Sequence, residues 1–235
     1  MTKVQCLAIV QELLWRHSSV GRANGSYPFG QGSESLCRYE DLLGKPGRFS
    51  FFLGKRTLPS YTLNMRLFYA LLFDPMTKDN LYKVQDRLET TLSKGSRTRK
   101  ENLHLTLCFL GEREPSLVDT LSSLLELLPT DSFNLCFTHL GRFSKQEGDV
   151  LWAGVSHSPE LHQLHHQLLT LLKNERIPVD EVGFQAHVTL YRRARCSDLV
   201  PIHPFTTEQC AIALMHSHQV KGVLTYTPLF TKVLH

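Results

Sequence analysis

The sequence predicts an α+β protein whose strands and helices alternate in two similar halves, related by a pseudo-twofold axis. From residue 65 onward, apolar runs typical of strands alternate with amphipathic stretches typical of helices, in the order β-α-β-α-β-β-α-β-β-β. Each half contains one copy of the same short pattern, His-apolar-Thr-Leu, at residues 104–107 and 187–190. This order favours a sheet with antiparallel and mixed pairing.

Each expected element has a local sequence signal. The first strand, RLFYALLF, is apolar on both faces, as is typical of a central strand. The helices carry leucines at helical spacing, and two of them begin near a proline, whose missing N–H costs little in a first turn. Gly111 is expected to end the first motif strand, and residues 93–100 to form a basic loop before it. The expected strands are 66–73, 102–111, 133–140, 150–155, 185–195, 207–216 and 222–233, and the expected helices are 77–92, 115–128 and 159–173.

Residues 1–64 do not resemble the rest of the chain. They hold seven of its 14 glycines, and residues 17–38 show neither a helical nor a strand period. The stretch WRHSSVGRA resembles the conceptual translation of a transfer-RNA gene. We therefore expect the natural start at or near Met65, with residues 1–64 a disordered extension or a spurious reading frame. A regulatory or targeting arm is the competing interpretation. The functional domain is expected at 65–235.

Composition excludes several classes of protein. The chain has no apolar run of about 18 residues and no credible signal peptide, so we expect a cytoplasmic protein that does not bind membranes. Its six cysteines form no CxxC pair, which argues against a disulfide framework and against a zinc site. The net charge of +4 comes from residues 1–64, with 8 Lys/Arg against 4 Asp/Glu. Residues 65–235 balance at 18 against 18. A general basic surface for nucleic acid is therefore not expected.

Positive charge gathers locally beside the two motifs. Arg97, Arg99 and Lys100 precede the first motif, and Arg192, Arg193 and Arg195 follow the second. We interpret them as a phosphate-attracting rim around a small site, the alternative being solvated loop charges.

The motifs combine residue types that suit acid–base chemistry on a phosphate. In a strand, residues i and i+2 share a face, so His104 lies beside Thr106 and His187 beside Thr189. An imidazole titrates near neutral pH, and a threonine hydroxyl can donate to a phosphate oxygen. One such pair is weak evidence, because a single strand histidine is usually structural. Two copies predict that the pairs face each other and act on one phosphate.

The other histidines are expected to lie on solvated faces and not to bind a metal. His162, His165 and His166 lie mostly off the apolar stripe of a helix and lack the acidic partner of a zinc-enzyme helix motif. His216 and His218 could bind a metal as an H-x-H pair, but no third ligand is evident. We expect no metal site.

Five segments resemble a known family: RLFYALLF (66–73), ENLHLTLCFLGE (101–112), LWAGV (151–155), AHVTLYRRAR (186–195) and TYTPLFTKVL (225–234). They are similar to the 2H phosphoesterase superfamily and, within it, to bacterial RNA 2′,3′-cyclic phosphodiesterases, historically called 2′-5′ RNA ligases. The likeness covers 65–235. It implies a bilobal 2H phosphoesterase fold, with two small sheets, outer helices and a central cleft lined by the two motif strands.

The resemblance also implies an activity, the metal-independent hydrolysis of RNA 2′,3′-cyclic phosphate ends to 2′-phosphates, without a cofactor. His104 would donate a proton to the leaving oxygen and His187 would activate water, although the pseudo-twofold leaves this assignment open. Thr106 and Thr189 would hold phosphate oxygens. The implied partners are RNA 3′ ends with a cyclic phosphate, transfer-RNA fragments among them, and we expect a monomer.

One further residue, Arg192, corresponds to an arginine that the family often shows three positions after the second threonine. Simple alternation from His187 instead puts Arg193 on the site face, and a bulge at the end of the strand would reconcile the two.

Three other functions stay open on the sequence. The same site run backwards would join a cyclic phosphate to a 5′-hydroxyl, as a 2′-5′ ligase acting on transfer-RNA halves does. A non-catalytic module that binds RNA ends is the second alternative, although binding alone would not require two titrating groups. A metal-dependent hydrolase is the third.

Overall fold

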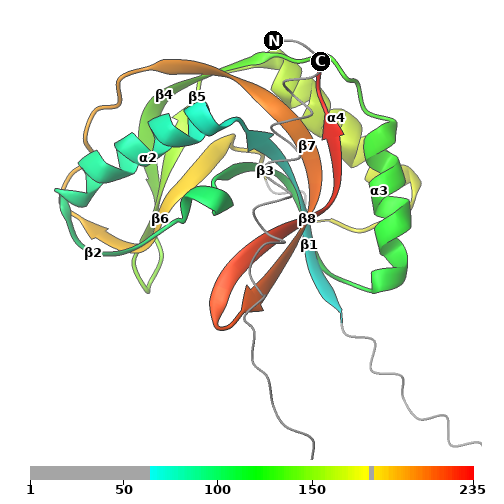
Figure 1. The fold of residues 1–235 in the computed structure, drawn as a ribbon, viewed down its shortest axis with the longest axis horizontal. Helices are drawn as coiled ribbons and strands as arrows, with labels where there is room; N and C mark the ends of the chain where they lie inside the picture. Colours follow the sequence, from blue (N-terminus) through cyan, green and yellow to red (C-terminus); the bar gives the residue numbers. More distant parts are fainter. Residues whose placement is uncertain (1–63, 180–182) are drawn as a thin grey trace, which may run out of the picture. The chain divides into compact units, whose positions relative to one another are not determined.

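The structure is a computed structural model, and it describes residues 64–179 and 183–235. The expectations for the N-terminal segment fall on residues 1–63, outside the described residues, and strand β1 begins at Met65. The described part is an α+β fold, as predicted (Figure 1). Its strands are β1 (Met65–Phe73), β2 (Leu92–Arg97), β3 (His104–Arg113), β4 (Asn134–Phe143), β5 (Asp149–Val155), β6 (His187–Cys196), β7 (Phe205–Val220) and β8 (Val223–Val233), and its helices are α2 (Pro75–Glu89), α3 (Val118–Glu126) and α4 (Pro159–Asn174).

The strands form two sets that are joined into one continuous sheet. One set contains β1, β3, β7 and β8, and the other contains β2, β4, β5 and β6. They meet at two places: β3 pairs with β6 at Leu105 and Val188, and β4 pairs with β7 over residues 134–137 and 205–208. Every pair in the described part of the chain is antiparallel, so the expected mixed pairing was wrong. The two expected lobes are therefore linked through their strands.

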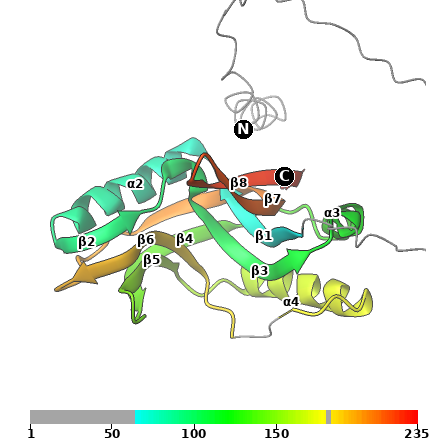
Figure 2. The same ribbon diagram turned by 90° about the horizontal axis from the view of Figure 1, so that it is seen from below.

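The helices interlock the two sets. Helix α2 follows β1 in the chain but packs against β2 and β6, and α4 follows β5 but packs against β3 and α3 (Figure 2). Helix α2 begins at Pro75, two residues before its expected start, and α4 begins at Pro159, as expected. The side chain of Asp74 accepts from the Thr77 N–H at 2.8 Å, and that of Ser158 accepts from the Leu161 N–H at 3.2 Å, each just before a proline. Each motif strand is thus supported by a helix from the other half.

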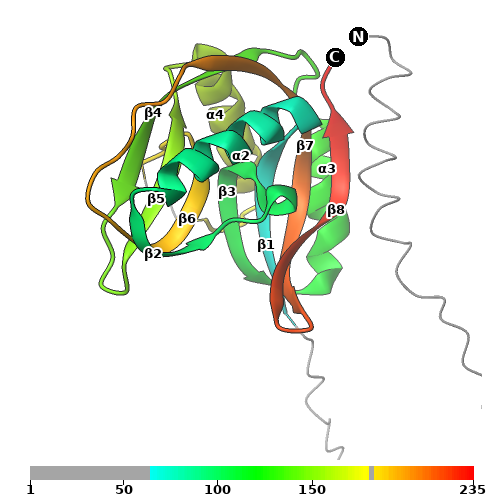
Figure 3. The ribbon, with the colours of Figure 1, turned by 60° about the vertical axis from the view of Figure 1, so that its left-hand side comes forward.

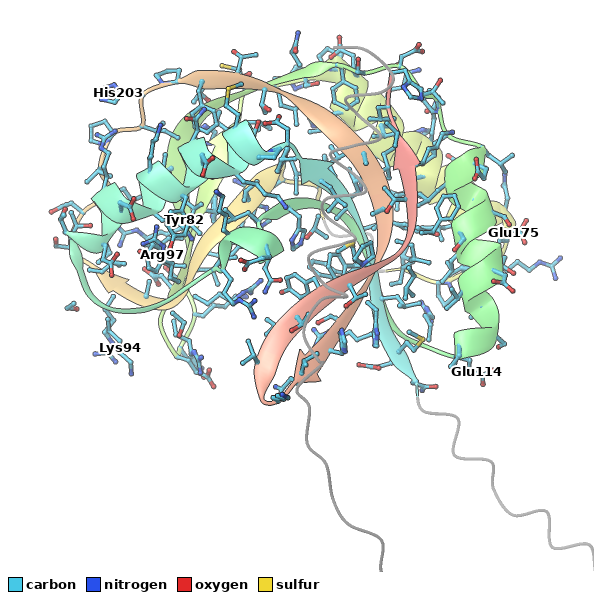
Figure 4. All side chains as sticks on the ribbon, viewed as in Figure 1. Tyr82, Lys94, Arg97, Glu114, Glu175 and His203 are labelled. Atoms are coloured by element: carbon cyan, nitrogen blue, oxygen red, sulfur yellow. The ribbon has the colours of Figure 1, made fainter. Side chains whose placement is uncertain are left out.

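Strand β2 corrects the expectation of a loop at 93–100. Its sequence LSKGSR has no apolar face, so its order comes from tertiary contacts that periodicity does not reveal. The buried Gln85 donates to the carbonyls of Thr98 and Leu190, at 2.9 and 2.8 Å. Arg97 bonds Asp86 at 2.6 Å, and its guanidinium lies 3.7 Å from the ring centre of Tyr82 (Figure 4). These contacts fasten β2 to α2 and to the end of β6.

Gly111 was expected to end the first motif strand, but β3 continues to Arg113. Gly111 has a φ of +73°, and the pairing of β1 with β3 shifts by one residue between Leu67 and Phe68, opposite it. A bulge of this kind needs a residue that tolerates positive φ, which is why glycine occurs here without ending the strand. A large apolar core lies on one side of β1 and β3, and a small cluster of Phe68, Ala70, Ala213 and Met215 lies on the other.

Candidate active site

The pairing of β3 with β6 brings the two motifs together. Leu105 and Val188, the middle residues of the two motifs, are partners in an antiparallel ladder, and both are fully buried. Extending this register by one residue sets His104 opposite Thr189 and Thr106 opposite His187. All four then lie on the face opposite the core, because neighbours along a strand alternate. The two histidines are diagonal neighbours, with backbones about 7–8 Å apart. This separation is compatible with one phosphate between the rings.

The two imidazoles are held in the same way. His104 donates from Nδ1 to the carbonyl of Asn102, and His187 donates from Nδ1 to the carbonyl of Gln185, both at 2.7 Å. Each acceptor lies two residues before its histidine. Because Nδ1 carries the proton in this arrangement, Nε2 has a lone pair when the ring is neutral. His104 Nε2 lies 3.1 Å from the Thr106 hydroxyl. Both rings can therefore use Nε2 for proton transfer.

Aromatic side chains from neighbouring strands form walls around both rings. The ring centre of His104 lies 5.0 Å from that of Phe68 on β1 and 5.1 Å from that of Tyr226 on β8. The ring centre of His187 lies 5.1 Å from that of Phe143 on β4 and 5.8 Å from that of Trp152 on β5. These walls restrict the tilt of each imidazole and exclude water from one side of it.

Burial lowers the pKa of both histidines. Loss of hydration lowers the pKa of His104 to about 4; the hydrogen bond to Asn102 acts in the opposite direction, and the charges of Arg192, Lys78 and His187 lower it further. Burial is also the main cause of the lowered pKa of His187, and the charge of Arg192 adds to it. Both rings are therefore neutral at pH 7 in the free site. A bound anion would favour their protonated forms, because it supplies an opposite charge nearby.

A bulge in β6 places Arg192 on the face of the motif residues. Between Thr189 and Tyr191, β6 advances two residues while β5 advances one, so Tyr191 is buried like Leu190 before it. Arg192 then lies on the same side as Thr189. A bulge of this kind was the feature expected to bring Arg192, and not Arg193, to the face of the site. A second bulge follows at Arg193, whose φ is +52°. Gly148 packs against this bulge, because a Cβ there would lie 2.8 Å from the Arg193 carbonyl carbon.

A cavity of about 800 Å³ opens on this face. Among the predicted site residues, His104, Thr189 and Arg192 line it, whereas Thr106 and His187 do not. Of the predicted basic rim, Arg97, Arg99, Arg192 and Arg193 line the cavity, whereas Lys100 and Arg195 do not. Arg97 and Arg99 have carboxylate partners, and Lys100 pairs with Asp79. No ion pair involves Arg192 or Arg193 among the residues that the structure describes, so both charges are available to an anion.

Sequence reasoning missed three side chains of the cavity wall. Asn102 is 8% exposed, Tyr226 contacts His104, and Lys145 reaches the cavity from the loop between β4 and β5. Asn102 and Tyr226 belong to segments whose resemblance to a family was noted, and that was the available signal. Their contacts depend on the position of the β7–β8 hairpin, which local pattern does not give.

The remaining histidines do not form a metal site in residues 64–179 and 183–235, where no three His, Cys, Asp or Glu side chains are grouped to hold an ion. His165 stacks on Phe184 with ring centres 4.0 Å apart, and His216 stacks on His218 at 4.5 Å. In the described part of the chain, every helix is too short or too polar to span a membrane.

Comparison with known proteins gives a consistent family. The model of the 2′-5′ RNA ligase superfamily matches residues 77–207. An Archaeoglobus fulgidus protein named RNA 2′,3′-cyclic phosphodiesterase is 30% identical over 132 residues, which cover 56% of this chain and 74% of that protein. An Escherichia coli protein of the same name is also 30% identical over 132 residues, covering 55% of this chain and 74% of the relative.

Solved structures agree in fold. Apo LigT of E. coli superposes with a TM-score of 0.63 at 25% sequence identity, over 73% of this chain and 98% of LigT. LigT in complex with 3′-AMP gives a TM-score of 0.62 at 26% identity, with the same coverage. The predicted α+β fold of this type is therefore confirmed.

Proposed function

The chain belongs to the 2′-5′ RNA ligase superfamily, and from this membership and the geometry of its site we propose that it hydrolyses RNA 2′,3′-cyclic phosphate ends to 2′-phosphates. The observation that carries the proposal is the pairing of Leu105 with Val188, which sets two His-x-Thr pairs on one face beside Arg192. The names of the relatives support the choice of substrate, and an 800 Å³ cavity is large enough for a nucleotide-sized ligand.

In the proposed reaction, a water oxygen attacks phosphorus in line with the bond to the 3′-oxygen. His187 Nε2 takes a proton from the water, and His104 Nε2 gives a proton to the 3′-oxygen as the P–O bond breaks. The 2′-oxygen keeps the phosphate. Thr106, Thr189 and Arg192 hold its non-bridging oxygens. The anionic substrate favours the protonated His104 that this step needs, since it offsets part of the burial that lowers the pKa of the free ring.

Hydrolysis is tested with the full chain and a short RNA that ends in a 2′,3′-cyclic phosphate, with the products separated by chromatography. We expect a 2′-phosphate end. H104A and H187A should each lower kcat by roughly 10²–10⁴-fold, the usual contribution of a general acid or base. H203A, which removes an exposed imidazole away from the site, is the control (Figure 4). Unchanged turnover in H104A or H187A would refute the proposal.

The assignment of acid and base is tested with a matched substrate in which sulfur replaces the 3′-oxygen. A thiolate leaves without a proton, so the loss of the general acid should matter much less on this substrate. We expect the sulfur substrate to restore turnover to H104A and not to H187A. Rescue of H187A instead would reverse the two roles.

Ligation is the second candidate, because the same site run backwards would join a cyclic phosphate to a 5′-hydroxyl, and the family name includes this activity. Adding an RNA with a 5′-hydroxyl to the same reaction separates the two, since ligation gives a longer product. Transfer-RNA fragments are the first natural substrates that we propose to test. We also propose that the protein acts as a monomer. The free thiols of Cys136 and Cys196 support the cytoplasm as its compartment.

A further inference from the structure

We infer that Asn102 is a positioning residue, which fastens the β7–β8 hairpin against His104 and thereby fixes the ring that transfers a proton. The inference rests on the proposed function, because it concerns the same imidazole. Asn102 has no assigned role, and its place in the structure differs from that of its counterpart in the second motif.

Asn102 binds the hairpin through its side chain. Its Nδ2 donates to the carbonyl of Leu224 at 3.0 Å, across 122 residues of sequence, and only 8% of the residue is exposed. Leu224 lies at the start of β8, just after the turn that joins β8 to β7 (Figure 3). The large side chains next to the turn, Val220, Val223 and Leu224, are exposed, and the nearest apolar contact of the hairpin with β1 is that of Tyr226 with Phe68. The carboxamide is therefore a polar anchor at the end of the hairpin, beyond this apolar contact.

The contacts of Asn102 close a loop around His104. The backbone carbonyl of Asn102 accepts the Nδ1 proton of His104. Two residues beyond Leu224, Tyr226 meets the imidazole edge-on, with ring centres 5.1 Å apart and an interplanar angle of 89°. These contacts run from Asn102 to Leu224 and from Tyr226 to His104, whose Nδ1 bonds back to Asn102. Movement of the hairpin would move the Tyr226 wall, and water would reach the imidazole.

The second motif has no such anchor. Gln185 occupies the corresponding position, two residues before His187, and its carbonyl accepts the Nδ1 proton in the same way. Its side chain is exposed, and in the described part of the chain it makes no hydrogen bond. Removing the carboxamide should therefore affect the first half-site much more than the second, which makes Q185A a matched comparison for N102A.

The first test measures the titration of His104 by NMR in the full chain. In N102A, the loosened hairpin should admit water, so the pKa of His104 should rise from about 4 toward its usual value, by about one unit or more. N102D keeps the shape but loses the donor and adds a negative charge, so the rise should be larger. Y226A removes the wall directly and should act in the same direction, which also provides a variant if N102A does not fold. An unchanged His104 pKa in N102A and Y226A would overturn the inference.

The second test compares kinetics on the oxygen and sulfur substrates. We expect N102A to lower kcat by about 10–100-fold, as small displacements of a reacting group do, and to follow the substrate pattern of H104A rather than that of H187A. The effects of N102A and Y226A should be less than additive, because both act on one wall. Q185A should lower kcat far less. Equal losses on both substrates, or additive effects, would mean a general structural role and refute the inference. An inactive wild type would refute the proposed function instead.

Discussion

Replacing His104 with glutamine should make the chain less sensitive to acid. The folded-state pKa of His104 is about 4, whereas a histidine in an unfolded chain titrates near 6.5. As the pH falls, the unfolded chain therefore binds this proton first, and the folded state loses stability between about pH 6.5 and pH 4, with no further loss below. Glutamine has a similar size and polarity, but it does not titrate.

The size of the effect follows from the shift. A difference of about 2.5 pKa units is worth about 3 kcal/mol when complete. Between pH 7 and pH 5.5 the wild type should lose about 1 kcal/mol more than H104Q, and between pH 7 and pH 4.5 about 2 kcal/mol more. Urea unfolding of both proteins at these three pH values gives the difference, in which the titration of all other groups cancels. Parallel pH dependence of the two proteins would refute the burial of His104 as the cause of its lowered pKa.

Three further outcomes are expected. R192A should lower kcat/KM for the cyclic phosphate by about 10–100-fold, since a charge-assisted hydrogen bond contributes about 1.5–3 kcal/mol, whereas R195A, outside the cavity, should change it little; equal effects would contradict the placement of Arg192. G148A should lower the free energy of unfolding by about 1–3 kcal/mol, because its Cβ would meet the Arg193 backbone. G183A is the control, because its added Cβ would meet no atom within 4 Å in the described part of the chain, and it is measured in the same urea experiment. A chelator such as EDTA should leave turnover unchanged, and a loss restored by added metal would favour the metal-dependent alternative.

Local pattern was enough to predict which side chains of each motif share a face of the strand. Strand alternation alone puts His104 beside Thr106 and His187 beside Thr189, because the period of two depends on backbone geometry and not on the partner strand. Alternation from His187 put Arg193, and not Arg192, on the face of the site, and a bulge in the strand was the feature expected to place Arg192 there. The structure has that bulge. In both cases the information lies within a few residues of the motif.

Features that depend on distant partners were not predictable. Strand β2 has no apolar period, and it is ordered by Gln85 and Arg97 through contacts with α2 and β6. Leu105 pairs with Val188, 83 residues away in sequence; the duplicated motif predicted that these two strands face each other, but not that they pair directly or in which register. Periodicity reports which face of an element is buried, but it does not report which element covers that face. For the same reason the exchange of α2 and α4 between the halves could not be foreseen.

The differences between the two half-sites come from residues outside the motifs. Both motifs supply a histidine with an Nδ1 bond to a carbonyl two residues earlier, so their local chemistry is the same. Yet hydrolysis of a phosphodiester requires two unlike proton transfers, one to the leaving oxygen and one from water. Tyr226 and the anchor at Asn102 are present on one side only, and they bury His104 in surroundings that His187 does not share. In the reaction that we propose, these unequal walls would give the two equal motifs different roles, one as proton donor and one as proton acceptor.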